Sequence, residues 1–375
     1  MKVVGPRAGE NRVGARSAGH RAGLGPSRAS EPLPSGPGAP SRHLHRLRPH
    51  GRGAVVVALL LVAAAALVVG RSRLTSPTYS SICVYPRESV TTLGQVDALT
   101  GHLYSCVMAY DNANPTWATW EVPWFATTKV VDRNWAAWVR ARAGRRLVIT
   151  ISLVPSDVPP DWRQICASGG YDPYAAALGR NLVNEGLSRS VLRISPEAND
   201  PGSGVAWNGG TPEDMSAWAR CWAQEARAMA VPGSHFLFDW TVNAGYEDIP
   251  FSDYYPGNSA VDIIGIDAYD SLVSGQQVPP GRKRWRLLSR EPGGIEQLVK
   301  FAKAHGKALS VPEWGEVAPP TGAGDDPYYM EQMARLFKRD HVAYESYFDE
   351  DEGGTLRLGQ IPQSFRVYQK MVLGG

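Results

Sequence analysis

Two glutamates end apolar runs of the chain, and a proline directly precedes each of them. Glu197 lies in "VLRISPEAND" (191–200) and Glu313 lies in "SVPEWGE". A lone acid at the end of a strand often caps the following helix. A pair of carboxylates at one site can instead cleave a glycosidic bond: one protonates the leaving oxygen, and the other attacks the anomeric carbon or activates water. The elements that position the two side chains decide between these readings.

Those elements repeat along the chain from about residue 80. A short apolar, β-branched run is followed by a polar loop and then by a helical stretch, a pattern typical of a parallel sheet covered on both faces. The eight runs are "SICVYP" at 81, "YSCVMAY" at 104, "RLVITISLV" at 146, "SVLRISPE" at 190, "HFLFDWTVN" at 235, "VDIIGIDAY" at 261, "KALSVPEWG" at 307 and "VAYESYF" at 342.

Eight strand–helix units of roughly 37 residues each match the count and size of a (β/α)8 barrel. An open doubly wound sheet is the alternative, but no G-x-G-x-x-G follows the first strand. The sixth strand is preceded by the turn "PGNSA" and not by a long helix, which makes that unit the least regular. We predict an α/β fold, a single TIM barrel over residues 80–375.

In such a barrel the catalytic side chains lie at the C-terminal ends of the strands. Glu197 would end strand four and Glu313 strand seven, across the barrel mouth from each other. An ionised Glu313 would raise the pKa of Glu197 by like-charge repulsion, as a general acid requires. Tyr269, at the end of strand six, is expected to hydrogen-bond Glu313. Arg193 and Asn199 are expected to fix the Glu197 carboxyl, although Arg193 suits a buried structural role equally well.

At these residues the chain resembles glycoside hydrolase family 26, the retaining β-mannanase and β-glucanase barrels, over roughly residues 80–370. In the family motif Arg-x-x-His-Glu-x-Asn-Gly, the residues Arg193, Glu197 and Asn199 match "RISPEAND". "VAWNGGTPEDMSAWAR", "YPGNSAVDIIGIDAYD" and "VPEWGE" resemble later segments of the family, including its strand-six tyrosine, here Tyr269. The resemblance implies that Glu197 is the acid/base and Glu313 the nucleophile.

The chain departs from the family motif at two positions. Pro196 stands where the family has a histidine, and Asp200 where it has a glycine. Strand eight has no tryptophan, and Tyr347 and Phe348 are its nearest aromatic residues. Because the histidine shapes the site beside the cleaved bond, its replacement bears on which sugar the site accepts. Flat sugar faces pack on aromatic rings, and the candidate substrate-binding residues are Trp207, Trp240, Trp314, Trp117, Trp120 and Trp124.

The first 79 residues differ in composition from the remainder. Residues 1–52 carry ten basic and two acidic residues in a Gly-, Pro- and Ser-rich segment, which predicts disorder. Residues 53–70 contain the uncharged run 54–69, which indicates either a transmembrane signal anchor or the apolar region of a cleaved signal. A linker, 71–79, would follow. With basic residues on its N-terminal side, the segment predicts a cytoplasmic tail and an extracytoplasmic barrel, membrane-anchored or secreted.

Four cysteines, Cys83, Cys106, Cys166 and Cys221, would then lie in an oxidising compartment. Cys83–Cys106 and Cys166–Cys221 is the pairing we predict, since each bond would join neighbouring βα units; buried free thiols are the alternative. No Cys or His spacing typical of zinc appears, and we predict no metal and no cofactor.

Other readings of the sequence have less support. Residues 53–375 carry 29 basic and 34 acidic residues, which argues against nucleic-acid binding. The basic run 281–290 would follow strand six and would bind an anionic polysaccharide or form a solvated surface. Neither G-x-S-x-G nor H-E-x-x-H is present, which disfavours serine and metal hydrolases. The main alternative to an endo-acting hydrolase of β-mannan or β-glucan is a non-catalytic glycan-binding barrel, in either case a monomer.

Overall fold

Eight parallel strands form a closed barrel in the computed structural model, which describes residues 81–111, 115–206, 208–245, 249–272 and 275–374. Each strand pairs with the next, β6 pairs with β7, and β8 returns to β1. The predicted fold and the predicted location of every strand are confirmed. The strands are β1 (Ser81–Tyr85), β2 (Cys106–Asp111), β3 (Arg146–Ile151), β4 (Val191–Ile194), β5 (Leu237–Asn243), β6 (Ile263–Tyr269), β7 (Ala308–Val317) and β8 (Tyr344–Phe348), with the short β9 (Thr355–Leu356) antiparallel to β7.

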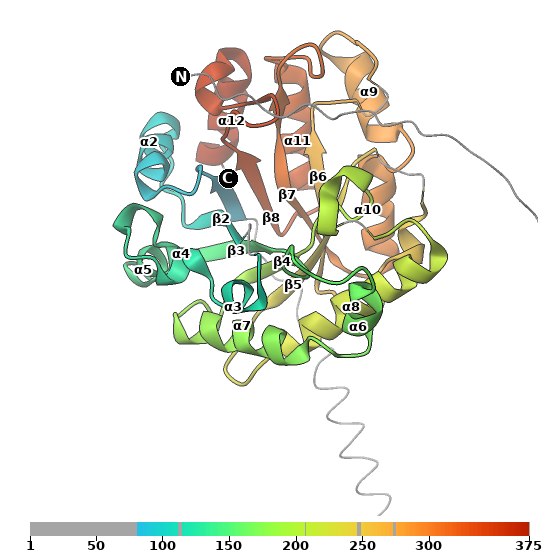
Figure 1. The fold of residues 1–375 in the computed structure, drawn as a ribbon. Helices are drawn as coiled ribbons and strands as arrows, with labels where there is room; N and C mark the ends of the chain where they lie inside the picture. Colours follow the sequence, from blue (N-terminus) through green and yellow to red (C-terminus); the bar gives the residue numbers. More distant parts are fainter. Residues whose placement is uncertain (1–80, 112–114, 207, 246–248, 273–274, 375) are drawn as a thin grey trace, which may run out of the picture. The chain divides into compact units, whose positions relative to one another are not determined.

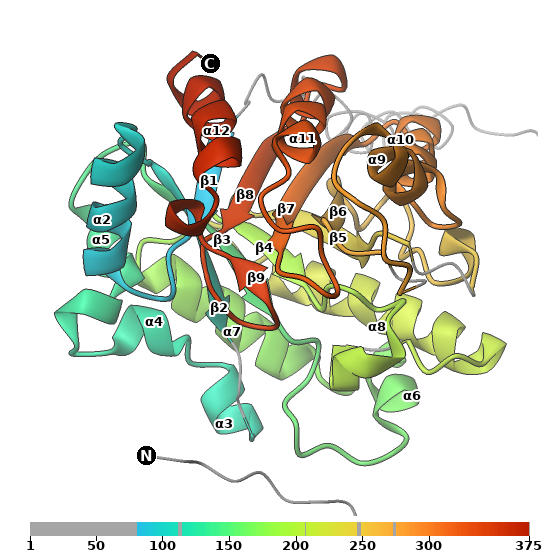
Figure 2. The same ribbon diagram turned by 90° about the horizontal axis from the view of Figure 1, so that it is seen from above.

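Helices surround these strands (Figure 1). Both views show α7 and α8 on the opposite side of the strands from α11 and α12 (Figure 2). In the described part of the loop between β5 and β6, the helical segment is the 3-10 turn η3 (Phe251–Asp253), which agrees with the irregular unit that the sequence predicts. The helices are α2 (Val90–Thr100), α3 (Trp117–Trp120), α4 (Trp124–Thr127), α5 (Trp135–Arg140), α6 (Trp162–Ala167), α7 (Asp172–Asn184), α8 (Pro212–Met229), α9 (Arg282–Arg290), α10 (Ile295–Ala304), α11 (Pro327–Arg339) and α12 (Pro362–Gly374).

Helix boundaries follow the local sequence. Helix α8 begins after Thr211, whose side chain accepts a hydrogen bond from the backbone N–H of Asp214, and Pro212 occupies its first turn. Helix α11 begins in the same way, after Asp326. Helix α2 ends at Gly101, whose φ of 73° belongs to the left-handed region. These caps define where each helix begins or ends, because they satisfy backbone groups that have no partner within the helix.

Strand residues alternate between two apolar layers. One layer lies between the strands and the helices and includes Leu147, Ile149 and Trp222. A smaller cluster, with Met108 and Val148 among its members, belongs to the opposite faces of the strands, which close the barrel interior. Because the interior carries its apolar residues with the polar groups described below, the barrel has a filled core and no pore.

The four cysteines form two disulfides, and the predicted pairing is confirmed. Cys83–Cys106 joins β1 to β2, at positions that are also register partners in the sheet. Cys166–Cys221 joins α6 to α8 on the outside of the barrel. Each bond therefore connects elements of neighbouring βα units.

The predicted tail, hydrophobic segment and linker all lie outside the described residues. Within the described ranges, no helix is both long enough and apolar enough to cross a bilayer.

Candidate active site

Glu313 reaches the barrel mouth because β7 is irregular at this point. Ser310 contacts the interior residue Asp239, yet Glu313, three residues later, also lies on the interior side. Strict alternation would place residues three apart on opposite faces. The pairing of β7 with β8 shifts register between Val311 and Trp314, which provides the extra residue. Asp267 of β6 accepts a hydrogen bond from the Glu313 backbone N–H at 3.1 Å.

Three side chains from three strands donate hydrogen bonds to the Glu313 carboxylate. Tyr269 of β6 donates to Oε2 at 2.9 Å, the contact that the sequence predicts. Arg193 of β4 and Tyr110 of β2 both donate to Oε1. With 9% of its surface exposed, Glu313 is a nearly buried carboxylate whose orientation is set from several sides. Such an arrangement suits a nucleophile, which needs a fixed approach to its target atom.

Glu197 lies in the short loop after β4, and backbone bonds set the path of this loop. Its N–H donates to the carbonyl of Thr241 on β5 at 3.1 Å, and Ser195 donates to Ile151 on β3 at 2.7 Å. Ser195 and Glu197, on either side of Pro196, have φ values of 43° and 59°. Residues other than glycine rarely adopt this left-handed region, and such strain clusters at functional sites. The proline therefore belongs to a strained turn that presents the carboxyl.

The surroundings of Glu197 favour its protonated form. Burial, and next to it the negative charge of Glu313, raises the pKa of Glu197 to about 7, against the opposing effect of Arg193. Glu313, in contrast, accepts hydrogen bonds from a guanidinium and two hydroxyl groups. The two carboxyl groups thus have the unlike environments that a general acid and a nucleophile require.

Of the two roles expected for Arg193, the buried structural one is confirmed, and the expectation that it fixes the Glu197 carboxyl is wrong. Its buried guanidinium forms ion pairs with Glu313 and Asp267. It also donates to Thr150 at 3.1 Å. The reason is that Arg193 belongs to β4 itself, inside the barrel, whereas Glu197 lies in the loop beyond the end of the strand.

Asn199 ties the Glu197 loop to the neighbouring strand. Its side-chain amide donates to the carbonyl of Asn243 at 2.8 Å, and its side-chain oxygen accepts from the Asn243 N–H at 3.0 Å. This reciprocal pair joins the loop after β4 to the end of β5. Asn199 thus acts on the backbone that carries Glu197.

Below the mouth, a polar group fills the barrel interior. Asp239 accepts hydrogen bonds from Ser310 and Tyr344, both at 2.6 Å, and from Thr241 at 2.8 Å. A Cβ atom at Gly265 would lie 2.4 Å from the Thr241 hydroxyl oxygen, so a larger residue at this position would displace the group. Arg193 contacts Thr241 from above at 3.4 Å. The interior thus supports the Arg193 guanidinium at its Nε atom.

Three of the six candidate tryptophans are structural, and the prediction that they contact substrate is wrong. Trp240 and Trp314 have no exposed surface, because on their strands they alternate with interior residues and therefore face the helices. Trp240 packs against Phe301 of α10 at 5.8 Å, and Trp314 against Phe337 of α11 at 5.1 Å. Trp120 is equally buried, and its ring N–H donates to the Ser152 carbonyl at 2.9 Å.

The remaining three tryptophans differ from one another. Trp117 is partly buried, and its ring stacks on Tyr174 of α7 at 4.5 Å. One face of the Trp117 ring is therefore covered by Tyr174. Trp124 is also partly buried, and it lies beside the candidate site, where its ring N–H donates to the Tyr110 carbonyl at 3.1 Å. Trp207 lies outside the described residues. The position of Trp124 leaves it as a candidate for substrate contact.

The basic run 281–290 forms α9, and its central arginine is structural. Arg284 is buried, forms an ion pair with Asp270 and donates to the Val278 carbonyl at 3.0 Å. These bonds attach α9 to the loop after β6. Arg290 forms an exposed ion pair with Glu296 at 3.0 Å. Part of the positive charge in this run is therefore already paired within the chain.

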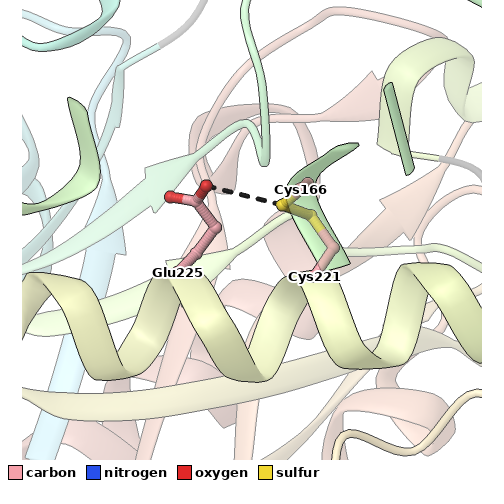
Figure 3. Close-up of side chains that lie close together, drawn as sticks. All are labelled: Cys166, Cys221 and Glu225. Atoms are coloured by element: carbon pink, nitrogen blue, oxygen red, sulfur yellow. Dashed lines mark hydrogen bonds between the residues drawn. A yellow bond between two sulfur atoms is a disulfide. The ribbon is translucent and has the colours of Figure 1, made fainter. Parts of the chain in front are cut away.

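One group of described side chains has the spacing of metal ligands: Cys166, Cys221 and Glu225 (Figure 3). Its two sulfur atoms are joined in a disulfide, so neither is available as a thiolate ligand. Glu225 lies 3.5 Å from Cys166 Sγ. Burial, with a smaller contribution from Asp172, raises the pKa of Glu225 well above its ordinary value. A neutral carboxyl packed on a disulfide is not a metal site.

Three contributors to the site are absent from the predicted site residues: Asp267, described above, Tyr110 and Glu88. Tyr110 is the last aromatic residue of the run "YSCVMAY", and a hydroxyl at the C-terminal end of a barrel strand is a signal that could have identified it. Glu88, in the loop after β1, accepts from the Tyr110 N–H at 2.6 Å and from the Trp135 ring N–H at 2.8 Å. Nothing in the sequence around Glu88 indicates these contacts.

Comparison with known proteins supports the fold that the sequence resemblance implies. No family model matches the chain, and no curated protein matches it. Among solved structures, similar folds include a modular endo-β-1,4-mannanase from Cellulomonas fimi (14% identity, TM-score 0.54, 79% of this chain and 70% of that chain covered). A family 26 β-mannanase from Bacteroides ovatus (13% identity, TM-score 0.53, 78% and 89% covered) is another.

A third similar structure is the family 26 domain of an endo-β-mannanase/endo-β-glucanase from Prevotella bryantii, with 15% identity, a TM-score of 0.51, and 82% and 94% of the two chains covered. All three belong to glycoside hydrolases of family 26, which the chain therefore resembles in fold as well as in its sequence motifs. At this level of identity the likeness concerns the fold.

Proposed function

We propose that the protein is a retaining endo-glycoside hydrolase that cleaves a β-linked polysaccharide, β-mannan first and β-glucan second. One observation carries the proposal: two carboxyl groups with unlike environments lie at the mouth of the barrel. Glu313 accepts hydrogen bonds from three side chains. Burial and the negative charge of Glu313 raise the pKa of Glu197 to about 7. The structurally similar enzymes are described as mannanases or as a mannanase/glucanase, which supports the choice of substrates.

The first step forms a covalent intermediate. Glu197 donates its proton to the glycosidic oxygen while a carboxylate oxygen of Glu313 attacks the anomeric carbon. The bond between that carbon and the leaving oxygen breaks, and the leaving chain departs as an alcohol. Glu197 is left ionised, and Glu313 is left as a glycosyl ester.

The second step restores the enzyme. Glu197, now a base, removes a proton from water as the water oxygen attacks the anomeric carbon. The ester bond breaks, and the Glu313 carboxylate returns to its three hydrogen-bond donors. Two inversions at one carbon give net retention of configuration.

The charge of the rim favours a neutral glycan. The loop after β8 carries Glu350, Asp351 and Glu352, and Arg87 in the loop after β1 forms ion pairs with the first two of these acids. Arg357 also pairs with Asp351, so these three acids exceed their two arginine partners by one negative charge. A uronate polymer would be repelled there, whereas mannan or glucan carries no charge.

Reducing-end release tests the proposal. The protein is incubated with mannan, lichenan and curdlan, beside β-linked polymannuronate as the charged control and a Glu313→Ala variant as the inactive control. We expect release from a neutral β-glycan by the wild type alone, and proton NMR of the first product should show the β-anomer. Release of the α-anomer would exclude the retaining mechanism.

The non-catalytic glycan-binding barrel is the alternative, and Pro196 is the observation that favours it. This residue replaces a histidine of the family motif beside the candidate acid. Binding of a β-glycan without release of reducing ends from any of them would establish this alternative.

We further propose that the barrel functions outside the cytoplasm, anchored in the membrane or secreted. The two disulfides support this location, because such bonds persist in oxidising compartments. Protease accessibility of the barrel in intact cells, compared with permeabilised cells, tests the location.

A further inference from the structure

We infer that Tyr110 is a positioning residue for the nucleophile: its hydroxyl orients the Glu313 carboxylate and stabilises it as the leaving group when the glycosyl-enzyme is hydrolysed. This inference rests on the proposed function. Tyr110 comes from β2, outside the segments that carry the resemblance to the family. Its hydroxyl donates to Oε1 of Glu313, the same oxygen that Arg193 contacts.

The backbone of Tyr110 is held at both of its polar groups. The Glu88 carboxylate accepts from its N–H at 2.6 Å, and the Trp124 ring N–H donates to its carbonyl at 3.1 Å. Glu88 has a φ of 53°, in the left-handed region that residues other than glycine seldom occupy. The Glu88 side chain, from a strained loop, and the Trp124 ring, from α4, thus hold the end of β2. The direction of the Tyr110 hydroxyl is therefore set before substrate binds.

The ring of Tyr110 is also enclosed. It meets Tyr85 of β1 edge to face at 5.0 Å and lies 6.5 Å from Phe348 of β8 in the same geometry. Burial, followed by the charge of Glu313, raises the pKa of the Tyr110 hydroxyl well above its ordinary value. The group therefore stays an O–H donor across the working range of pH.

The chemical effect of this donor differs between the two steps. A hydrogen bond to a carboxylate is stronger than one to an ester, because the carboxylate carries the full negative charge. The Tyr110 bond weakens when Glu313 becomes the glycosyl ester and strengthens again when the ester bond breaks. It therefore lowers the barrier to hydrolysis of the intermediate, in which Glu313 is expelled as an anion.

Substitution of the hydroxyl separates this role from packing. Tyr110→Phe keeps the ring, and Tyr104→Phe is the matched control, because it removes a buried hydroxyl that pairs with Tyr368 on an outer helix. Both variants are compared with the wild type on an activated aryl β-glycoside in stopped flow. For Tyr110→Phe we expect kcat to fall about 10- to 100-fold, the range for a hydrogen bond to a charged group. KM should fall with it, and a burst of aryl alcohol should appear as the intermediate accumulates.

For Tyr104→Phe, kcat and KM should stay within about twofold of the wild-type values, because its hydroxyl is remote from the reacting atoms. No burst should appear with this variant. If Tyr110→Phe retains wild-type kcat, or loses kcat without a fall in KM and without a burst, the inference is wrong.

A second measurement needs no activity. In protein with 13C-labelled glutamate carboxyls, the Glu313 signal is assigned by its loss in Glu313→Gln. We expect its chemical shift to differ between Tyr110→Phe and the wild type, since the carboxylate has lost a hydrogen-bond donor. An inactive wild type that shows this difference would refute the proposed function and leave the contact established. An active wild type with the same Glu313 chemical shift in the two proteins would refute only the role of the contact.

Discussion

At the scale of single residues, Arg193 links the nucleophile to the interior of the barrel, because its guanidinium contacts both Glu313 and interior side chains. It is a fully buried cation shared by Glu313 and Asp267. Transferring ions into a protein interior is costly, so the group is stable only while its charges remain paired. The same contacts that orient the nucleophile therefore also hold the centre of the barrel together.

Removal of this cation should destabilise the whole domain. We expect Arg193→Met to lower the free energy of unfolding by about 3–5 kcal/mol, because two buried carboxylates lose their partner. Arg335→Met is the matched control, since Arg335 is exposed and pairs with Glu331 one helical turn away; its effect should stay below about 1 kcal/mol. Urea unfolding measures both changes. Equal effects of the two substitutions would contradict the structural role of Arg193.

Glu197 can be tested as the acid through the choice of leaving group. Glu197→Gln should reduce cleavage of polysaccharide by about 10²- to 10⁴-fold, because the departing alkoxide is no longer protonated. A dinitrophenyl glycoside needs no proton, so formation of its glycosyl-enzyme should be largely retained. Added azide, which needs no base, should restore turnover of this substrate. Equal losses on both substrates would assign Glu197 another role.

At the scale of elements, an irregular strand and a strained loop bring the two carboxyl groups together. The register shift in β7 turns Glu313 inward, and the left-handed residues on either side of Pro196 carry Glu197 over the mouth. Outside the barrel, the disulfide Cys166–Cys221 joins α6 to α8, and α8 is the helix that follows the Glu197 loop.

The two disulfides should differ in their contributions. Cys166–Cys221 spans 55 residues and Cys83–Cys106 spans 23. In the chain-entropy model the longer loop stabilises more, by about 0.8 kcal/mol, on a total of about 3–4 kcal/mol for each bond. We expect the Cys166→Ala/Cys221→Ala variant to unfold at a lower urea concentration than the Cys83→Ala/Cys106→Ala variant does. The reverse order would show that native packing around the bonds, and not chain entropy, determines their contributions.

At the scale of the whole molecule, buried acids couple stability to pH. Burial, opposed by the hydrogen bond from Trp314, raises the pKa of Glu345 to about 8. Burial likewise raises the pKa of Glu88 to about 7, against its hydrogen bonds to Tyr110 and Trp135. In the unfolded chain these carboxyls titrate near their ordinary value of 4.5. The folded protein therefore binds more protons between those pKa values than the unfolded chain does.

Stability should consequently fall as pH rises. The contribution of these groups is complete below about pH 4.5 and is lost progressively up to about pH 8, so Tm should decrease across the range from pH 5 to 8.5. Calorimetry at constant ionic strength measures this slope. Glu345→Gln keeps an acceptor for Trp314 but does not titrate, so its slope should be shallower. A Tm that rises with pH over this range would contradict the prediction.

Much of the fold was predictable, because its signals are local. Apolar β-branched runs of the right length mark all eight strands, and cap residues such as Thr211 and Gly101 mark helix ends. The pairing of Cys83 with Cys106 and of Cys166 with Cys221 was predictable, because each pair lies in neighbouring βα units, which pack side by side. The tryptophans were harder, because Trp240 and Trp314 lie within β5 and β7, on the outward face of each strand that helices cover. The sequence near a strand end does not indicate which face a residue takes when a bulge intervenes.

The sequence by itself determined the barrel and the candidate pair Glu197 and Glu313, because strand periodicity and the ends of parallel strands are local properties; its resemblance to the family supplied the contact of Tyr269 with Glu313. Only the tertiary structure decided that Arg193 pairs with Glu313 and that Tyr110 is the third donor. Those contacts join residues 120 and 203 positions apart. They depend on barrel closure and on the bulge in β7, which bring distant segments within hydrogen-bonding distance, and no short-range pattern encodes that approach.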